Sequence, residues 1–244
     1  MISTADRSHD RFATTRWSMV MQLAAAESPD ARRALGELAQ RYWYPVYAYV
    51  RRCGHAPDVA QEITLSFLQR LLRDMCQDPA QKSPGLYRSY LLDRLHAFLA
   101  ADWTESVQVE PLTEQLRAPP DLEARYQSDH SDTRSPDETF QRGFALEVLH
   151  RALRRLRSEA AQTGHLDMYE KLEPYLARDP VPGEYELMAA QLGTRVMALV
   201  LALKRLRQRF GELAAEELAD TVGSADDLAA EQDALLHVLG EGER

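Results

Sequence analysis

Apolar residues recur along most of this chain with the three-and-four spacing that marks one face of an amphipathic helix. The clearest case follows Pro57, where one side of the expected helix collects Ala60, Ile63, Phe67, Leu71 and Leu72. No stretch of any length shows the strict alternation that a half-buried strand requires. The pattern therefore predicts an all-α protein.

Turn residues and shifts in composition divide the periodic segments. We expect helices over residues 12–26, 30–52, 57–74 and 86–104, which together form an N-terminal domain over residues 10–104. Residues 105–135 are rich in Pro, Asp, Glu, Ser and Thr, which is typical of a mobile linker. A second helical domain over residues 136–215 and an acidic tail over residues 216–244 follow. The sequence thus predicts two helical domains joined by an acidic linker.

The end of the second predicted domain has a recognisable supersecondary pattern. From Gly183 to Leu213 the sequence indicates a short helix, a turn at Gly193 and a longer helix. A short helix, a glycine-containing turn and a longer helix form a helix-turn-helix. We therefore predict a helix-turn-helix at the end of residues 136–215.

The distribution of charge along the chain is more informative than the total charge. The net charge is −9 and the isoelectric point is near 5.3, values that disfavour a nucleic-acid binder. The net charge is +3 over residues 1–100 and +4 over 140–211, but −7 over 101–139 and −9 over 212–244. The acid is therefore concentrated in the predicted linker and tail, while both predicted domains are mildly basic.

Several classes of protein are disfavoured by what the sequence lacks. It contains no apolar run of about 18 residues, and the first residues lack the apolar core of a signal peptide. Cys53 and Cys76 do not make a disulfide framework and are typical of reduced thiols. We found no metal-ligand spacing, nucleophile elbow or phosphate-binding glycine loop. We therefore expect a cytoplasmic protein without membrane partner, cofactor, metal or catalytic site.

Four segments, in this order, resemble the extracytoplasmic function (ECF) sigma factors of bacterial RNA polymerase. They are FATTRWSMV from Phe12, RYWYPVYAYVRRCGHAPDVAQEITLSFLQRLL from Arg41, LYRSYLLDRLHAFLAADW from Leu86 and YELMAAQLGTRVMALVLALKRLRQRF from Tyr185. They make up about a third of the chain and are spread in this order over residues 12–210, which is more specific than any single motif. The resemblance implies that residues 10–104 bind core RNA polymerase and open the −10 promoter element. It also implies that the helix-turn-helix reads the −35 element.

The resemblance assigns the polymerase-docking role to one helix. The corresponding residues are Asp58, Gln61, Glu62, Thr64 and Leu65. Gln61 stands where the family carries an acid, so the acidic cluster is thinner than usual. Phosphorylation of Thr64 would restore about −1.5 to −2 charges, which makes a Ser/Thr kinase a candidate partner. The alternative is that Thr64 is an ordinary helix-surface or half-buried threonine.

The resemblance also assigns residues to promoter DNA. Those expected near unpaired bases are Tyr87, Arg88, Tyr90, His96 and Trp103, and those expected on the upstream duplex are Arg195, Lys204, Arg205, Arg207 and Arg209. The run of arginines from Arg151 to Arg157 fits either a DNA-contacting face or a solvated one. The aromatic run from Tyr42 to Tyr49 fits base stacking or a packed core, and its helical spacing favours the core.

Two departures from the family pattern leave a second interpretation open. After Trp103 the chain has no Lys or Arg until Arg117, although phosphate contacts supply much of protein–DNA affinity. The segment from Val196 to Leu203 is apolar where small polar residues usually face the major groove. It could instead be a buried packing helix.

These departures favour a degenerate, sigma-like regulator that binds proteins and no longer reads promoters. A plain helix-turn-helix repressor is a third alternative, which leaves the N-terminal resemblance unexplained. An anti-sigma factor is a further candidate partner. The acidic tail also suggests a regulatory hypothesis, in which it folds over the basic helix-turn-helix, against the alternative of a solubilising flank.

Overall fold

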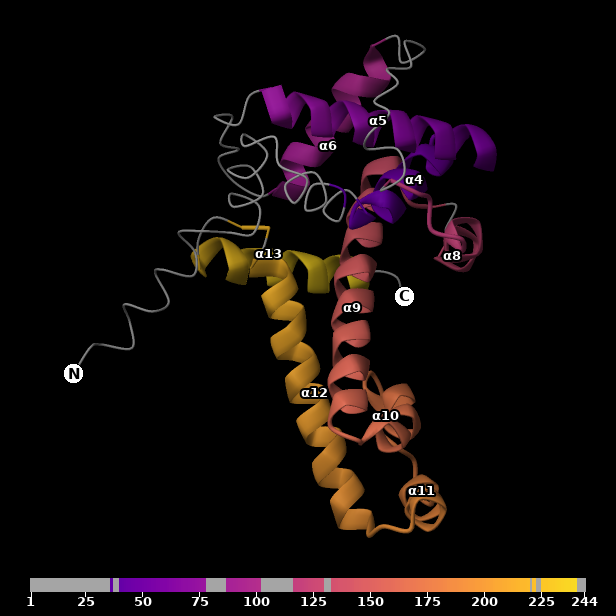
Figure 1. Ribbon diagram of the computed structural model, residues 1–244, viewed down its shortest axis with the longest axis vertical. Helices are drawn as coiled ribbons and strands as arrows, with labels where there is room; N and C mark the ends of the chain where they lie inside the picture. The colour runs from indigo at the N-terminus through magenta and orange to yellow at the C-terminus, as the bar shows by residue number, and fades with distance from the viewer. Residues whose placement is uncertain are drawn as a thin grey trace, which may run out of the picture. The chain divides into compact units, whose positions relative to one another are not determined.

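The computed structural model is helical throughout its described parts (Figure 1), which confirms the predicted all-α fold. It describes residues 36, 40–77, 87–101, 116–129, 133–219, 221–222 and 225–240. In these ranges no strand is present. The helices are α4 (Trp43–Arg52), α5 (Pro57–Gln77), α6 (Tyr87–Ala100), α8 (Leu122–Asp129), α9 (Pro136–Gln162), α10 (Leu166–Leu172), the 3-10 helix η1 (Glu173–Tyr175), α11 (Glu184–Leu192), α12 (Val196–Ala219) and α13 (Ala225–Gly240).

The chain divides into two compact units whose limits differ from the predicted domains. The first unit contains residues 1–147 and 218–244, and the second contains residues 148–217. The first unit is therefore built from both ends of the chain, with the second inserted between them. Both α9 and α12 continue from one unit into the other. Sequence composition did not indicate a boundary inside a continuous helix.

The break between α4 and α5 was predicted correctly. Gly54 has a φ of 96°, in the left-handed region that favours glycine. Pro57 then begins α5, where its missing N–H has no helical partner to lose. The helix predicted over residues 12–26 lies outside the described residues.

The aromatic run of α4 forms the centre of the core of the first unit. Its five aromatic residues, all at most 8% exposed, are Tyr42, Trp43, Tyr44, Tyr47 and Tyr49. The ring of Tyr42 stacks on that of Phe144 in α9 with centroids 6.0 Å apart. The preference for a packed core over base stacking is therefore confirmed.

Part of the predicted mobile linker is a packed element of the first unit. The apolar side chains of Leu116, Leu122 and Tyr126 are at most 4% exposed. Glu123 of α8 accepts two hydrogen bonds from Arg51 of α4, both 2.9 Å long. The buried apolar residues and the pairing of Glu123 with Arg51 explain why residues 116–129 are ordered, although their composition is typical of a mobile linker.

The acidic tail is not only the solubilising flank that one alternative predicted. It contains the helix α13, which belongs to the first unit. Its side chains at Glu231 and Leu235 are 1% and 4% exposed. The tail therefore contributes to the first unit. The hypothesis had instead placed it over the basic helix-turn-helix of α11 and α12.

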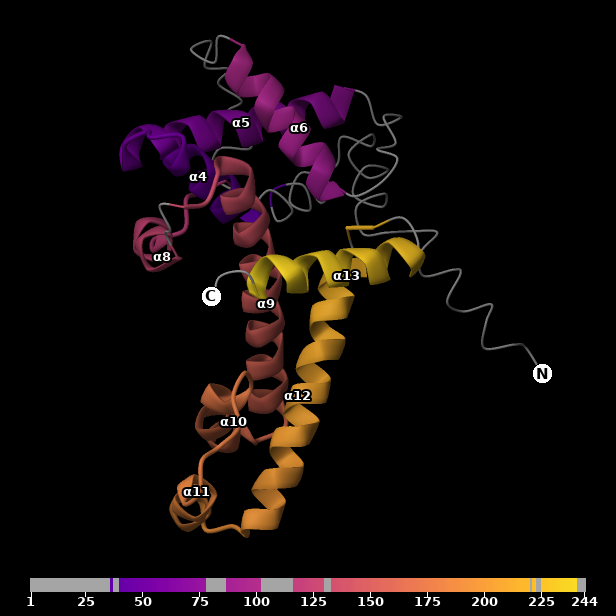
Figure 2. The ribbon, with the colours of Figure 1, turned by 180° about the vertical axis from the view of Figure 1, so that it is seen from behind.

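The second unit is organised around α9 and α12, which run side by side in opposite directions (Figures 1 and 2). The end of α9 packs against α10 and α12 through Leu156, Tyr169 and Leu213. Near the start of α12, Leu199 and Leu203 pack against Leu172 and against Met188 of α11. These two apolar clusters hold α11 and the first turns of α12 in place.

Candidate functional site

The outward face of α5 is acidic and polar. Asp58, Gln61 and Glu62 are exposed and Leu65 is half-buried, at positions that share one side of the helix. The opposite side, with Ala60, Ile63 and Phe67, is buried in the core of the first unit. Within the described residues, neither Asp58 nor Glu62 has a hydrogen bond or ion pair. Four of the five residues that the resemblance assigned to docking therefore lie on one accessible side.

Thr64 does not belong to this face. It is 0% exposed, and its hydroxyl donates a hydrogen bond of 2.7 Å to the backbone oxygen of Ala60 one turn earlier. A kinase cannot reach a hydroxyl that the core encloses. The phosphorylation hypothesis, and the expected surface or half-buried position of Thr64, do not fit this fold. Thr64 is buried next to Ile63. The nearby acidic residues in the sequence had suggested the exposed side of the helix.

The two residues that begin α6 are also buried. Tyr87 is 3% exposed, and its ring lies 5.0 Å from that of Tyr42 and 6.0 Å from that of Tyr90. Burial raises the pKa of Tyr87 well above its ordinary value. In this structure Tyr87 cannot stack on a base, so its assignment to unpaired DNA fails for the conformation described.

Arg88 is held by the C-terminal helix. Its Nε donates to Oε1 of Glu231 over 2.7 Å and its Nη2 donates to Oε2 over 2.8 Å. The two side chains are 9% and 1% exposed. In such a bidentate pair, two parallel N–H groups of the planar guanidinium donate to the two oxygens of one carboxylate. Arg88 is therefore not available to DNA phosphate in this structure, which corrects its assignment as an exposed contact.

The remaining residues assigned to unpaired bases are dispersed. Tyr90 is half-buried, and His96 is exposed with Nε2 2.9 Å from Oδ1 of Asp137 in α9. The His96 ring also lies 5.7 Å from that of Tyr49. Trp103 lies outside the described residues. Of the predicted set on α6, only Tyr90 and His96 reach the surface.

In the second unit, α11 and α12 are joined by a short turn. Gly193 ends α11 with φ 61° and ψ 32°, in the left-handed region. The axes of α11 and α12 differ by 100° across the break. Residues Gly193, Thr194 and Arg195 form this turn, and α12 begins directly after it.

The first turns of α12 present a mixed apolar and cationic surface. Its large apolar side chains, between 36% and 66% exposed, are Val196, Met197, Val200 and Leu201. Arg195, Lys204 and Arg205 are also exposed, with no ion pair to the described residues. Only the inner positions Leu199 and Leu203 are buried. The segment is therefore not buried within the described residues, and packing against a second copy of the chain stays open.

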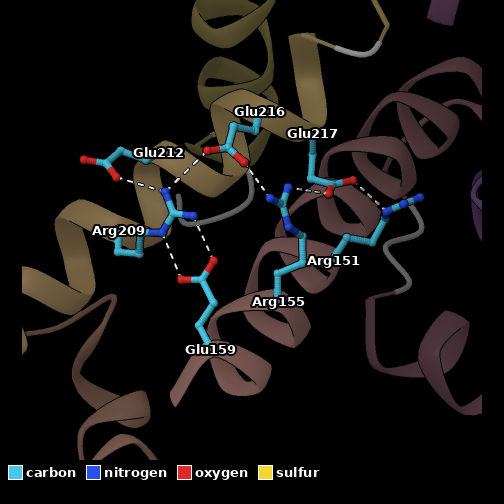
Figure 3. A network of polar contacts seen from close by, with 7 residues as sticks. All are labelled: Arg151, Arg155, Glu159, Arg209, Glu212, Glu216 and Glu217. Carbon is cyan, nitrogen blue, oxygen red and sulfur yellow. Dashed lines mark hydrogen bonds and ion pairs between the residues drawn. The ribbon is translucent and has the colours of Figure 1, made fainter. Parts of the chain in front are cut away.

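The other two cations assigned to duplex DNA are engaged internally. Arg207 donates to Asp179 Oδ1 over 2.7 Å and to the backbone oxygen of Tyr175 over 2.7 Å. Arg209 forms a bidentate pair with Glu159 of α9, with bonds of 2.8 and 2.9 Å (Figure 3). The Arg209 guanidinium lowers the pKa of Glu159. Arg207 and Arg209 therefore stabilise the second unit and do not project toward a partner.

The arginine run on α9 follows the same principle. Arg151 donates to Glu217 over 2.9 Å, and Arg155 contacts both Glu216 and Glu217 (Figure 3). Arg157 pairs with Glu170 at 2.6 Å. Acids of α12 and α10 therefore pair with part of this run, while Arg154 and Arg157 are exposed, as the solvated-face interpretation expected.

A groove in the second unit was missed by the sequence analysis. It has a volume of about 540 Å³, and its apolar lining includes Leu156, Ala160, Met168, Tyr169, Leu201 and Leu206. These residues come from three helices that are remote in sequence, so no local pattern marks them. A volume of this size is in the range of ligand pockets, and the polar residues of the lining are Glu159, Thr163, His165, Arg205 and Arg209.

The described residues contain no group of three or more His, Cys, Asp or Glu side chains placed to hold a metal ion. Among the described helices, none taken alone is long and apolar enough to cross a membrane. The pair α11 and α12 passes that test together, by length and composition only.

Comparison with known proteins identifies no relative: no family model, curated protein or solved structure matches this chain.

Proposed function

We propose that this protein is an ECF-like sigma factor that binds core RNA polymerase and directs transcription initiation. The outward face of α5 is the observation that carries this proposal. In the family that the sequence resembles, the corresponding helix presents acids to basic residues of the largest polymerase subunits. Asp58, Glu62 and Leu65 offer the same chemistry here, with no competing partner among the described residues.

The geometry of α11 and α12 supports the DNA-binding half of the proposal. Two helices at about 90–120° joined by a three- or four-residue turn make a helix-turn-helix, and the observed angle is 100°. We propose that α12 is the recognition helix. Arg195, Lys204 and Arg205 are exposed cations that can meet phosphates or a guanine edge.

The direct test is binding of the purified chain to core RNA polymerase. Glu62→Lys reverses one exposed charge at the centre of the α5 face, and we expect it to weaken binding by about 10-fold. Asp233→Lys makes the same charge change at an exposed position of α13 and should leave the dissociation constant within about 2-fold. The affinities can be measured by fluorescence anisotropy of the labelled chain. Equal losses in both variants would reduce the effect to net charge and remove α5 as the docking face.

A second candidate function is a sigma-like regulator that binds proteins and no longer reads promoters. It is favoured by the exposed apolar side chains at the start of α12, which cannot read a hydrogen-bond code. The internal use of Arg88, Arg207 and Arg209 favours it as well.

Run-off transcription from the DNA upstream of its own gene separates the two candidates. A sigma factor gives a transcript that depends on the added chain. Polymerase binding without a transcript from any tested promoter supports the regulator. A chain that does not bind polymerase contradicts the sigma factor and leaves the regulator only with a protein partner other than polymerase.

A further inference from the structure

We infer that α13 is an autoinhibitory cap on α6. This inference rests on the proposed function, because it concerns the helix that would capture the opened DNA strand. The cap is the helix α13, whose Glu231 holds Arg88 in the first turn of α6, while Thr221, just before this helix, accepts a hydrogen bond from the backbone of Tyr87. The resemblance assigns Tyr87 and Arg88 to DNA, and both are at most 8% exposed.

The main contact imitates the interaction that Arg88 would make with DNA. The Glu231 carboxylate accepts two parallel hydrogen bonds from the guanidinium, at 2.7 and 2.8 Å. Arginine recognises carboxylate and phosphate with the same bidentate geometry. Glu231 therefore occupies the donors that a backbone phosphate would need, and the cap and the DNA strand exclude one another at Arg88.

Other contacts place the cap over the start of α6. The backbone N–H of Tyr87 donates to the backbone oxygen of Thr221 over 3.3 Å. Val222, which follows Thr221, and Leu235 of α13 are 2% and 4% exposed. The start of α6 is thus held by one buried ion pair and one backbone hydrogen bond.

The composition of the cap fits a displaceable competitor. The helix α13 carries four acids and no Lys or Arg, so it is repelled by DNA and attracted to cations. A protein whose competent state is rarely populated binds its ligand more weakly in proportion. Closing the cap therefore lowers the affinity of α6 for a single strand without altering α6 itself.

The experiment compares two variants of the full-length chain that remove the same charge from the same helix. Glu231→Gln breaks the buried pair, whereas Asp233→Asn changes an exposed residue two positions away. The probe is a fluorescently labelled single-stranded DNA of randomised sequence, and anisotropy gives the dissociation constant. Hydrogen exchange of the first turn of α6 reports opening of the cap independently of DNA.

We expect Glu231→Gln to open the cap, because an arginine left buried without its partner strongly favours exposure. Amide exchange at the start of α6 should rise, and DNA should bind at least about 10-fold more tightly. Asp233→Asn should change the affinity by less than about 2-fold. Equal gains in both variants would show a bulk charge effect and would overturn the inference, as would faster exchange without tighter DNA binding.

A second variant covers the case in which Glu231→Gln does not fold, as judged by circular dichroism. Leu235→Ala loosens the cap without leaving a buried charge, and the same gain in DNA affinity is expected. If both variants unfold, α13 is an integral part of the first unit and not a cap. Polymerase binding measured on the same samples keeps the two proposals apart, because it depends on α5: a capped chain that does not bind polymerase refutes the proposed function alone.

Discussion

At the scale of single residues, Glu123 joins elements that are distant in sequence. Its carboxylate accepts hydrogen bonds from both Arg51 and the hydroxyl of Tyr47, the latter at 2.5 Å. The Arg51 guanidinium lowers the pKa of Glu123 from 4.5 to about 2, with a further contribution from Tyr47. A carboxyl whose pKa is lower in the folded state stabilises the fold when it is ionised.

This shift predicts a pH-dependent contribution to stability. The stabilisation by Glu123 is complete above pH 4.5 and is lost as the pH falls toward 2. Because the Glu123 side chain is 35% exposed, solvent screening reduces the effect, and we expect Glu123→Gln to cost about 1 kcal/mol at pH 7. Urea unfolding at several pH values should show the difference from the unsubstituted chain shrinking between pH 5 and pH 2. A constant difference would contradict the assignment.

Thr64 gives a second prediction at this scale. A charged side chain at a fully buried position is costly, so Thr64→Glu should lower the free energy of unfolding by more than about 3 kcal/mol. Thr64→Val keeps the shape and leaves the Ala60 carbonyl with its helical partner, so it should cost no more than about 1 kcal/mol. Denaturant unfolding measures both. A stable Thr64→Glu chain would mean that this side of α5 is accessible after all, and would revive regulation by phosphate.

At the scale of helices, the crossing of α4 and α9 depends on the absence of one side chain. A Cβ added to Gly143 of α9 would lie 3.1 Å from the Cα of Pro45, closer than nearly all real Cβ contacts. The neighbour is backbone, so it cannot move aside as a flexible side chain can. The glycine allows α9 to approach α4 closely and so supports the stacking of Tyr42 on Phe144.

Two Gly→Ala substitutions test this point with opposite expected signs. Gly143→Ala should destabilise the first unit by about 1–3 kcal/mol through overpacking. Gly211 lies in the exposed middle of α12 with no atom within 4 Å of an added Cβ, and Gly211→Ala should stabilise by about 0.5–1 kcal/mol. Thermal unfolding reports both. Stabilisation by both substitutions would show that the crossing has room to spare.

At the scale of the whole molecule, local periodicity was sufficient for the helical class and for the sides of α5 other than the position of Thr64, which is buried. The same reasoning did not find the ion pairs that fix Arg88 and Arg209, because their acidic partners lie 143 and 50 residues away along the chain. The sequence alone does not distinguish a cation that faces DNA from one that pairs with a buried carboxylate. One signal was present, however: Glu231 stands on the apolar side of its helix, between Leu228 and Leu235.

Part of the predicted linker is ordered for a related reason. Average composition over residues 105–135 is that of a disordered segment, but Leu116, Leu122 and Tyr126 are buried, and Tyr126 and Glu123 contact Tyr47 and Arg51 of α4. An average composition over the segment does not reveal these few buried residues. The limits of the two units were likewise hidden, since α9 and α12 are continuous across them.

The return of α13 to the first unit has a consequence for the newly made chain. Arg88 leaves the ribosome 143 residues before Glu231, which at about 5–20 residues per second is a delay of roughly 10–30 s. During that interval α6 can fold against α4 and α5 while its first turn is still uncovered. Each molecule therefore begins without the Glu231 carboxylate beside Arg88, and a chain truncated before Glu231 never acquires it.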